Sequence, residues 1–154
     1  MIKAVNVSTA YGERLMQDKV SFSVKSGEIY GILGGSGTGK TTLLKTMIYL
    51  NRPTTGDIFF GGVNLWKSDE KTKNEMKKQM GVMFQFGALF SSLNVLENIG
   101  VMLKEYSDFS GNDIREIAKM WLLKVGLKKE AALLYPSELS GGMKKRVALA
   151  RALV

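Results

Sequence analysis

The stretch GGSGTGKT, residues Gly34 to Thr41, decides the fold of this chain. It follows the apolar run EIYGIL at residues 28–33, and the run KTTLLKTMIYL at residues 40–50 overlaps its end. An unalternated apolar run favours a strand covered on both faces of a parallel sheet, whereas the second run favours a helix. A glycine loop between a buried strand and a helix, ending in Lys and Thr, fits the pattern G-x-x-x-x-G-K-[ST]. The sequence therefore predicts an α/β core built around this loop.

The physical properties of such a loop point to phosphate binding. Glycines let the backbone curl with its N–H groups pointing inward, and the start of the following helix adds further donors. Lys40 supplies a mobile positive charge, and the Thr41 hydroxyl can ligate Mg²⁺. A glycine-rich turn that binds nothing is the alternative, but it does not require Lys and Thr at these places. The predicted nucleotide-binding residues are Gly34, Gly35, Ser36, Gly37, Thr38, Gly39, Lys40, Thr41 and Thr42.

Composition narrows the chemistry further. The 154 residues are 45% hydrophobic and include neither cysteine nor histidine, which excludes disulfides, thiol nucleophiles and imidazole bases. The net charge of +8 suits nucleic acid, a membrane surface or phosphate-rich ligands. The basic residues fall in three groups, at 67–78, 124–129 and 144–151, and each reads as the solvated face of a helix. We predict no signal peptide and no transmembrane helix, because residues 79–96 are interrupted by polar side chains.

The first 85 residues contain further strand patterns and one further helix pattern. Residues 20–24 alternate apolar and polar side chains, and DIFFGGVNL at residues 57–65 reads as a hairpin with a Gly-Gly turn. Residues 67–78 predict a charged helix, and GVMFQ at residues 81–85 predicts another buried strand.

The character of the chain becomes helical after Gln85. Asn94 and Glu97 form a predicted capping box for a helix through Leu103, and Asn112 or Asp113 is predicted to cap the next helix. That helix is predicted to end at Gly126 and to bury one stripe, which comprises Ile114, Ile117, Ala118, Trp121, Leu122 and Val125.

The segment LSGG at residues 139–142, followed by MKKRVALARAL, predicts another bare helix start. Ser140 is a good N-cap, the two glycines expose the backbone, and the predicted buried stripe is Met143, Val147, Ala150 and Val154. Together with the glycine loop about a hundred residues earlier, this segment resembles the signature of ATP-binding cassette (ABC) ATPases, and the resemblance covers the whole chain. It implies that Ser140, Gly141 and Gly142 contact ATP held by the glycine loop of a second subunit, in a head-to-tail homodimer. The alternative is an ordinary helix start.

The same resemblance assigns roles to Tyr11 and Gln85. Tyr11, in TAYGERL, matches the aromatic residue that stacks on adenine; otherwise it is a core or edge residue. Gln85 matches the glutamine that contacts Mg²⁺ and the attacking water, so Thr41 and Gln85 are the predicted metal contacts. A glutamine at a strand end is otherwise unremarkable.

One departure from the usual signature indicates a branch of the family. Met143 stands where Gln is usual, and FGALFSSL follows Gln85. Both features resemble ATPases that power MCE-type lipid trafficking. Phe86, Leu89 and Phe90 are candidates for a groove that receives a permease helix, although core packing is the plainer interpretation.

The resemblance also predicts what the chain lacks. The family carries an Asp-Glu strand end and a histidine after its signature, and none is present here. We therefore expect this chain to be the N-terminal portion of a nucleotide-binding domain, with an incomplete core. By itself such a portion should hydrolyse ATP very slowly. We also expect that it either associates with itself or comes from a longer protein. The predicted organisation is a core at 1–85, a helical subdomain at 86–139 and the signature helix at 140–154.

The predicted fold is thus an α/β P-loop NTPase with an ABC-type core, an antiparallel β edge beside a parallel sheet, and a helical insert. The predicted function is the ATPase subunit of a transporter, with ATP and Mg²⁺ as cofactors. It would lie in the cytoplasm on the inner face of the membrane, with an integral-membrane permease as partner and an MCE-type lipid-binding protein as another candidate. The alternative is a soluble ABC protein that acts on nucleic acid or ribosomes, although we expect no nucleic acid partner. A third hypothesis is a nucleotide sensor that binds ATP without hydrolysing it.

Overall fold

The computed structural model describes residues 1–154, which form two compact units, Met1–Gln79 and Met80–Val154.

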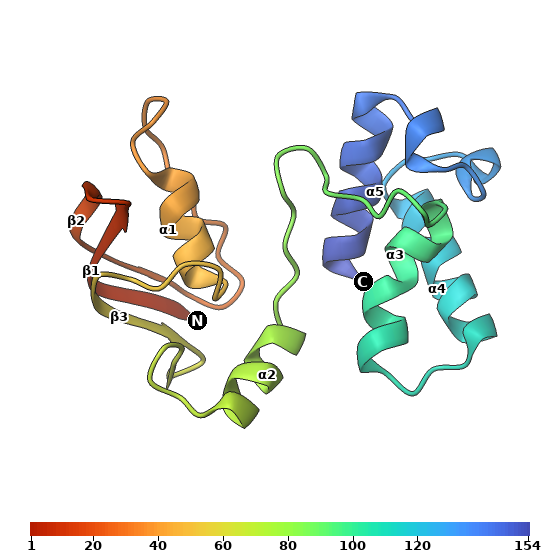
Figure 1. The fold of residues 1–154 in the computed structure, drawn as a ribbon. Helices are drawn as coiled ribbons and strands as arrows, with labels where there is room; N and C mark the ends of the chain where they lie inside the picture. Colours follow the sequence, from red (N-terminus) through yellow and green to blue (C-terminus); the bar gives the residue numbers. More distant parts are fainter. The chain divides into compact units, whose positions relative to one another are not determined.

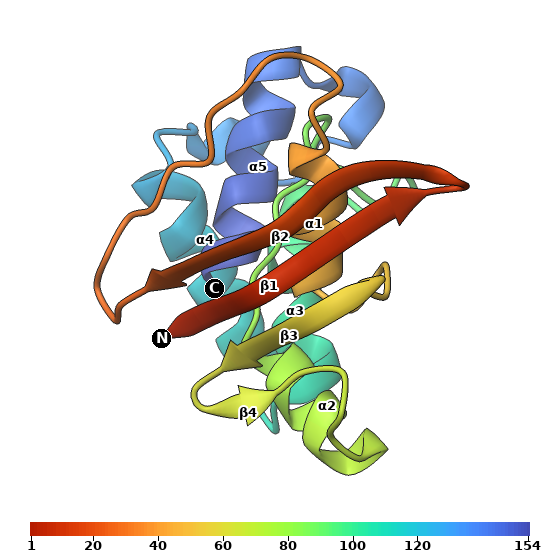
Figure 2. The same ribbon diagram turned by 90° about the vertical axis from the view of Figure 1, so that its left-hand side faces the viewer.

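The first unit is built on a four-stranded antiparallel sheet, shown face-on in Figure 2. Its strands are β1 (Ile2–Tyr11), β2 (Arg14–Val24), β3 (Thr55–Phe60) and β4 (Val63–Asn64), in the order β2-β1-β3-β4. The alternation at residues 20–24 and the hairpin at 57–65 are confirmed, since β2 and the β3–β4 pair contain them. The long central strand β1 was not predicted. Its buried side chains join those of other elements in the core of this unit, which comprises Ala4, Val7, Leu43, Ile58 and Leu65.

Two helices complete this unit. Helix α1 (Lys40–Met47) lies against one face of the sheet, where its Leu43 and Thr46 are buried (Figure 2). It ends earlier than the periodicity predicts, and Tyr49, which follows the C-cap residue Ile48, adopts a positive φ of 64°. Helix α2 (Glu70–Lys78) begins after Asp69, whose side chain accepts a hydrogen bond from the Thr72 N–H. No residue of α2 is buried, which confirms that this basic segment is a solvated helix face.

Two predicted strands are wrong in this structure: EIYGIL at residues 28–33 and GVMFQ at residues 81–85 pair with no strand. Ile29 is fully exposed and Leu33 is 94% exposed, so the first segment is not covered on both faces. Within it, Tyr30 stacks on Phe22 of β2, and the Glu28 carboxylate accepts a hydrogen bond from the Lys25 N–H at 2.7 Å. An extended segment becomes a strand only when a neighbour satisfies its backbone N–H and C=O groups, and neither segment has a strand as partner.

The second unit is helical. It consists of α3 (Val95–Tyr106), α4 (Gly111–Lys124) and α5 (Gly141–Leu153), with short 3₁₀ turns η1 (Lys129–Ala131) and η2 (Pro136–Glu138) before α5 (Figure 1). The three helices share one core, formed by Val95, Leu96, Ile99, Ala118, Leu122, Leu127, Leu139, Val147 and Ala150. The predicted stripes of α4 and α5 supply the central members of this core, while Trp121, Val125, Met143 and Val154 are partly buried at its border.

The helix starts agree with the sequence in two of three cases. Asn94 caps α3 through the predicted capping box with Glu97, and Ser140 caps α5 by accepting from the Met143 N–H. The prediction for α4 was wrong, because Ser110 is the cap and Asp113 is its capping-box partner one turn later. Gly126 follows the end of α4 with a φ of 73°, as predicted. No helix has both the length and the hydrophobicity needed to cross a bilayer.

Candidate nucleotide-binding site

The glycine loop of residues 34–39 leads directly into α1. Gly37 and Gly39 have φ values of 79° and 85°, a region that side chains other than glycine disfavour. Gly39 is also the N-cap of α1, and a Cβ there would lie 3.0 Å from the Met16 Cβ and 3.2 Å from the Met16 carbonyl oxygen. The close approach of β2 to Gly39 therefore adds a steric reason for glycine to the conformational one.

Lys40 curls back over the loop. Its amine donates hydrogen bonds to the carbonyl oxygens of Gly34 at 2.7 Å and Gly35 at 2.6 Å. The Thr38 hydroxyl donates to the Gly35 carbonyl at 2.9 Å, and the Gln17 amide donates to the Thr38 carbonyl at 3.0 Å. These contacts hold the loop in a closed curl with the positive charge inside it. Gln17, on β2, is a support of the loop that no local pattern in the sequence indicates.

The start of α1 is arranged to receive an anion. Gly39 has no side chain with which to cap the helix, and the first turn contains no acidic residue. The first amide groups of a helix lack partners within it and carry the positive end of its dipole. Together with the Lys40 amine, they form a concentration of donors where a phosphate group fits.

The exposed Thr41, at the start of α1, offers a hydroxyl ligand for Mg²⁺. No group of three or more His, Cys, Asp or Glu side chains in the structure lies close enough to hold a metal ion. Mg²⁺ commonly takes few protein ligands and completes its octahedron with phosphate oxygens and water. The residues present therefore fit a magnesium ion that arrives with a nucleotide, and Thr41 would hold it.

Tyr11 lies at the end of β1, where it pairs with Arg14 across the turn to β2. Its side chain is 77% exposed, so it is not a core residue. An exposed ring at the tip of a hairpin is available for stacking on a flat ligand.

The second candidate phosphate contact is the start of α5 in the helical unit. Ser140, Gly141 and Gly142 are exposed, and a Cβ at either glycine would meet open space. The first turn of α5 again has no acidic residue. Like the start of α1, this helix end presents bare backbone donors, so both halves of the sequence prediction have the local geometry they need.

Gln85 is exposed and lies in a turn before α3. The three apolar residues that follow it differ in their surroundings. Leu89 packs against the core of the helical unit, Phe86 is 85% exposed, and Phe90 is 52% exposed. The groove interpretation therefore does not apply to Leu89, which is a packing residue.

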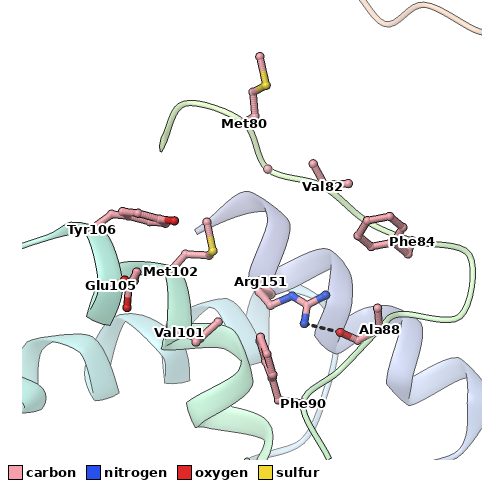
Figure 3. Close-up of a pocket in the computed structure, with 11 residues that line it drawn as sticks. Met80, Val82, Phe84, Ala88, Phe90, Val101, Met102, Glu105, Tyr106 and Arg151 are labelled. Carbon is pink, nitrogen blue, oxygen red and sulfur yellow. Dashed lines mark hydrogen bonds between the residues drawn. The ribbon is translucent and has the colours of Figure 1, made fainter. Parts of the chain in front are cut away.

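Phe90 lines a cavity of about 480 Å³ beside this turn, drawn in Figure 3. The cavity lies between the segment at residues 80–84 and the side chains of α3 and α5, and its wall is largely apolar, with Val82, Phe84, Val101 and Met102. Arg151 and Glu105 are the charged residues at it. Arg151 was not predicted as a functional residue.

Comparisons with known proteins agree with these features. A sequence model of the family described as "ABC transporter" matches residues 17–154. The intermembrane phospholipid transport system ATP-binding protein MlaF of Haemophilus influenzae is 41% identical over 99% of the chain, and the chain spans 58% of that relative. The chloroplastic protein TRIGALACTOSYLDIACYLGLYCEROL 3 of Arabidopsis thaliana is 44% identical over the whole chain, which spans 44% of it.

Solved structures show the same fold. The ATP-binding cassette MJ0796, in a dimeric post-hydrolysis state bound to ADP and Pi, superposes with a TM-score of 0.91 at 32% identity, covering 99% of this chain and 69% of that one. The structure of cbiO1 from Clostridium perfringens, part of an ABC transporter complex, gives a TM-score of 0.81 at 26% identity over 99% of this chain and 60% of that one. The predicted α/β cassette fold is thus confirmed, and the chain belongs to the ABC transporter family of ATP-binding proteins.

Proposed function

We propose that this chain forms the ATP-binding part of an ABC transporter subunit that couples ATP binding and hydrolysis to the movement of phospholipid. The observation that carries the proposal is the pair of bare helix starts, Gly39–Lys40 at α1 and Ser140–Gly142 at α5, each with open backbone donors and no acidic neighbour. The phospholipid assignment is supported by the similarity to MlaF at 41% identity.

In this proposal the loop at residues 34–42 cradles the phosphates of ATP, and the Lys40 amine exchanges its carbonyl partners for phosphate oxygens. Thr41 would hold Mg²⁺, and Gln85 is its second proposed protein contact. When bound, Mg²⁺ neutralises charge on the phosphates. Tyr11 stacks on the base, and Ser140, Gly141 and Gly142 donate to the terminal phosphate of a nucleotide in a second subunit. The dimeric MJ0796 structures support such a pairing.

The partner in the membrane is a permease, which we propose to contact the helical unit at the cavity beside Phe84 and Phe90. The cavity is largely apolar, and half-exposed aromatic side chains at its edge favour an apolar protein partner. With such a partner, the protein would lie on the cytoplasmic face of a membrane. An MCE-type lipid-binding protein is a further proposed partner of the assembly.

The test is ATP binding and turnover by the full-length protein with Mg²⁺. Lys40→Ala removes charge-assisted hydrogen bonds worth about 1.5–3 kcal/mol, so ATP affinity should fall about 10- to 150-fold. Lys45→Ala, on the same helix but at its last turn, is the matched control and should leave affinity within about twofold.

Ser140→Ala should leave ATP binding by the single subunit intact while slowing turnover. The nucleotide-binding proposal fails if Lys40→Ala and Lys45→Ala bind ATP equally well. The phospholipid assignment fails if full-length protein with its permease, in liposomes, moves no labelled phospholipid while hydrolysing ATP. Salt-sensitive binding of RNA by the same protein would favour the nucleic acid alternative instead.

A further inference from the structure

Arg151 on α5 holds the segment that follows Gln85. Its two terminal nitrogens donate to adjacent carbonyl oxygens, Nη2 to Gly87 at 2.7 Å and Nη1 to Ala88 at 2.8 Å. The guanidinium also lies over the ring of Phe90, 5.9 Å from its centroid. Figure 3 shows the side chain between Ala88 and Phe90, with the bond to Ala88 dashed. A planar fork with two parallel donors is a geometry that Arg offers and Lys does not.

The backbone of this segment is shaped to meet α5. Gly87 has a φ of 81°, and a Cβ there would lie 3.3 Å from the Lys144 carbonyl oxygen and 3.4 Å from the Ala148 Cβ. Ala88 also has a positive φ, 46°, which is disfavoured for a residue with a side chain. The unusual turn points both carbonyl groups toward Arg151. Strain of this kind persists where the surroundings hold it in place.

The other end of the segment is held by α3. Asn98 is fully buried; its Oδ1 accepts from the Phe90 N–H at 2.8 Å, and its Nδ2 donates to the carbonyl oxygens of Phe90, Leu93 and Asn94. The segment of residues 85–93, which we call the Gln85 loop, is thus tied at its far end to α3 and at its near end to α5. Asn98 acts on residues close to it in sequence, whereas Arg151 reaches across 63 residues.

We propose that Arg151 is a positioning residue for ATP hydrolysis, which sets the place of Gln85 relative to the signature helix α5. The proposal rests on the proposed function, in which Gln85 serves the nucleotide of its own subunit and the start of α5 serves the nucleotide of the second subunit. Ser140 and Arg151 lie on one rigid helix, eleven residues or about 16 Å apart along its axis. A displacement of α5 is therefore transmitted to the turn beside Gln85 through two hydrogen bonds rather than through mobile backbone.

Burial supports this role. Arg151 is half-buried, and burial lowers the pKa of its guanidinium, but Arg stays charged at any physiological pH. No carboxylate neutralises it, because its partners are the two carbonyl groups and an aromatic ring. Removing even part of a cation from water without an acidic partner costs free energy, and the hydrogen bonds to the two carbonyl groups offset that cost.

The experiment is a double-mutant cycle in the full-length protein, with Arg151→Lys combined with Gln85→Ala. Lysine keeps the charge but cannot bridge both carbonyl groups, so kcat should fall about tenfold while KM for ATP changes less than about twofold. If Arg151 acts through Gln85, the same substitution in the Gln85→Ala background should lower kcat by less than about twofold.

The matched control is Arg146→Lys. Arg146 lies on the same helix and also donates to a backbone carbonyl, that of Gly126 at 3.0 Å, away from the Gln85 loop. It should leave kcat within about twofold in both backgrounds. Arg151→Gln, which keeps amide donors but no charge, serves as a second variant if Arg151→Lys fails to fold.

Hydrogen exchange gives a second readout. Amide exchange at residues 86–90 should accelerate in Arg151→Lys and remain unchanged in Arg146→Lys. The inference is overturned if exchange there is unaltered, or if Arg151→Lys costs as much in the Gln85→Ala background as in the wild type. In either case the wild-type protein still hydrolyses ATP. If the proposed function itself is wrong, the wild-type protein neither binds nor hydrolyses ATP, and the inference fails together with the proposed function.

Discussion

Single glycines in the sheet show how one position can constrain the fold. Gly56 on β3 has a φ of 85°, and a Cβ there would lie 2.2 Å from the Asn6 carbonyl oxygen on β1. The register between β1 and β3 shifts between Val5 and Ser8, where Asn6 itself has a positive φ. The irregular pairing therefore depends on a residue without a side chain at position 56.

Gly56→Ala should strongly destabilise the protein. A positive φ costs a residue with a Cβ about 1–2 kcal/mol, and overpacking against backbone that cannot move adds about 1–3 kcal/mol. Gly61→Ala is the matched control, because Gly61 also has a positive φ, 57°, but meets nothing within 4 Å. Urea unfolding measures both, and equal losses for the two variants would contradict the steric argument.

Carboxylates beside α2 make stability sensitive to acid. The Lys67 amine, 2.7 Å away, and the Asn64 amide lower the pKa of Asp57, and the Thr72 N–H lowers the pKa of Asp69. Because a depressed pKa in the folded state means that the unfolded chain binds protons more readily, the stabilisation is present above about pH 4 and is lost as pH falls through the folded-state value.

Asp57→Asn should therefore destabilise the protein at pH 7 but have a smaller effect in acid, once the pH has fallen below the lowered pKa of Asp57 and the carboxyl is protonated. Chemical unfolding midpoints at pH 7 and in acid measure the difference. Asp108→Asn, which removes a carboxylate from the helical unit, controls for the general change in charge. An equal shift of the midpoint at both pH values would show that the Asp57 carboxylate is not the source.

At the scale of elements, the start of α4 illustrates how helix boundaries are chosen. Ser110 accepts from the Asp113 N–H, while the Asp113 carboxylate accepts from the Ser110 N–H at 3.2 Å. The sequence offers several polar residues in a row, and each is a good cap by type. Ile114 packs against Gly100 of α3, where a Cβ would lie 2.6 Å from the Ile114 side chain. This contact sets which face of α4 points toward α3, and hence where the first turn of α4 begins.

Ser110→Ala should cost about 1 kcal/mol, because it leaves an amide of the first turn without its partner. Asn112→Ala should cost clearly less, since Asn112 lies inside the first turn and Ala favours a helix. Thermal unfolding of the helical unit, followed by circular dichroism, separates the two. A larger loss for Asn112→Ala would restore the boundary that the sequence alone predicts.

At the scale of the whole molecule, the 154-residue chain exposes apolar side chains on unpaired backbone. Ile29 and Leu33 are 100% and 94% exposed on a segment that no strand pairs. Extended backbone with free N–H and C=O groups and apolar side chains is a template for pairing with another chain.

We expect this 154-residue chain to associate with itself, and Ile29→Lys with Leu33→Lys to reduce that association. Leu133→Lys is the control, since Leu133 is 64% exposed but does not lie on such a segment. Light scattering across a concentration series measures the effect. A monomer at all concentrations, or an equal effect of the control, would contradict the expectation.

The candidate site was predictable to the extent that it depends on local backbone. The glycine loop at residues 34–41 and the start of α5 at Ser140 are short segments whose conformation follows from the residues in them, since glycine permits the turn and serine caps the helix. The same holds for the capping box of Asn94.

Contacts that join distant residues were decided by the tertiary structure alone. Whether residues 28–33 form a strand depends on a partner that satisfies their backbone, and the grip of Arg151 on Gly87 spans 64 residues. The apolar residues and their helical periodicity indicate which side chains are buried and which face of a helix they occupy. They do not indicate which distant carbonyl group a side chain will contact. The sequence by itself thus determined the family and the candidate phosphate-binding segments. The tertiary structure determined strand pairing and the support of the Gln85 loop, because these interactions exist only once the chain has brought remote groups together.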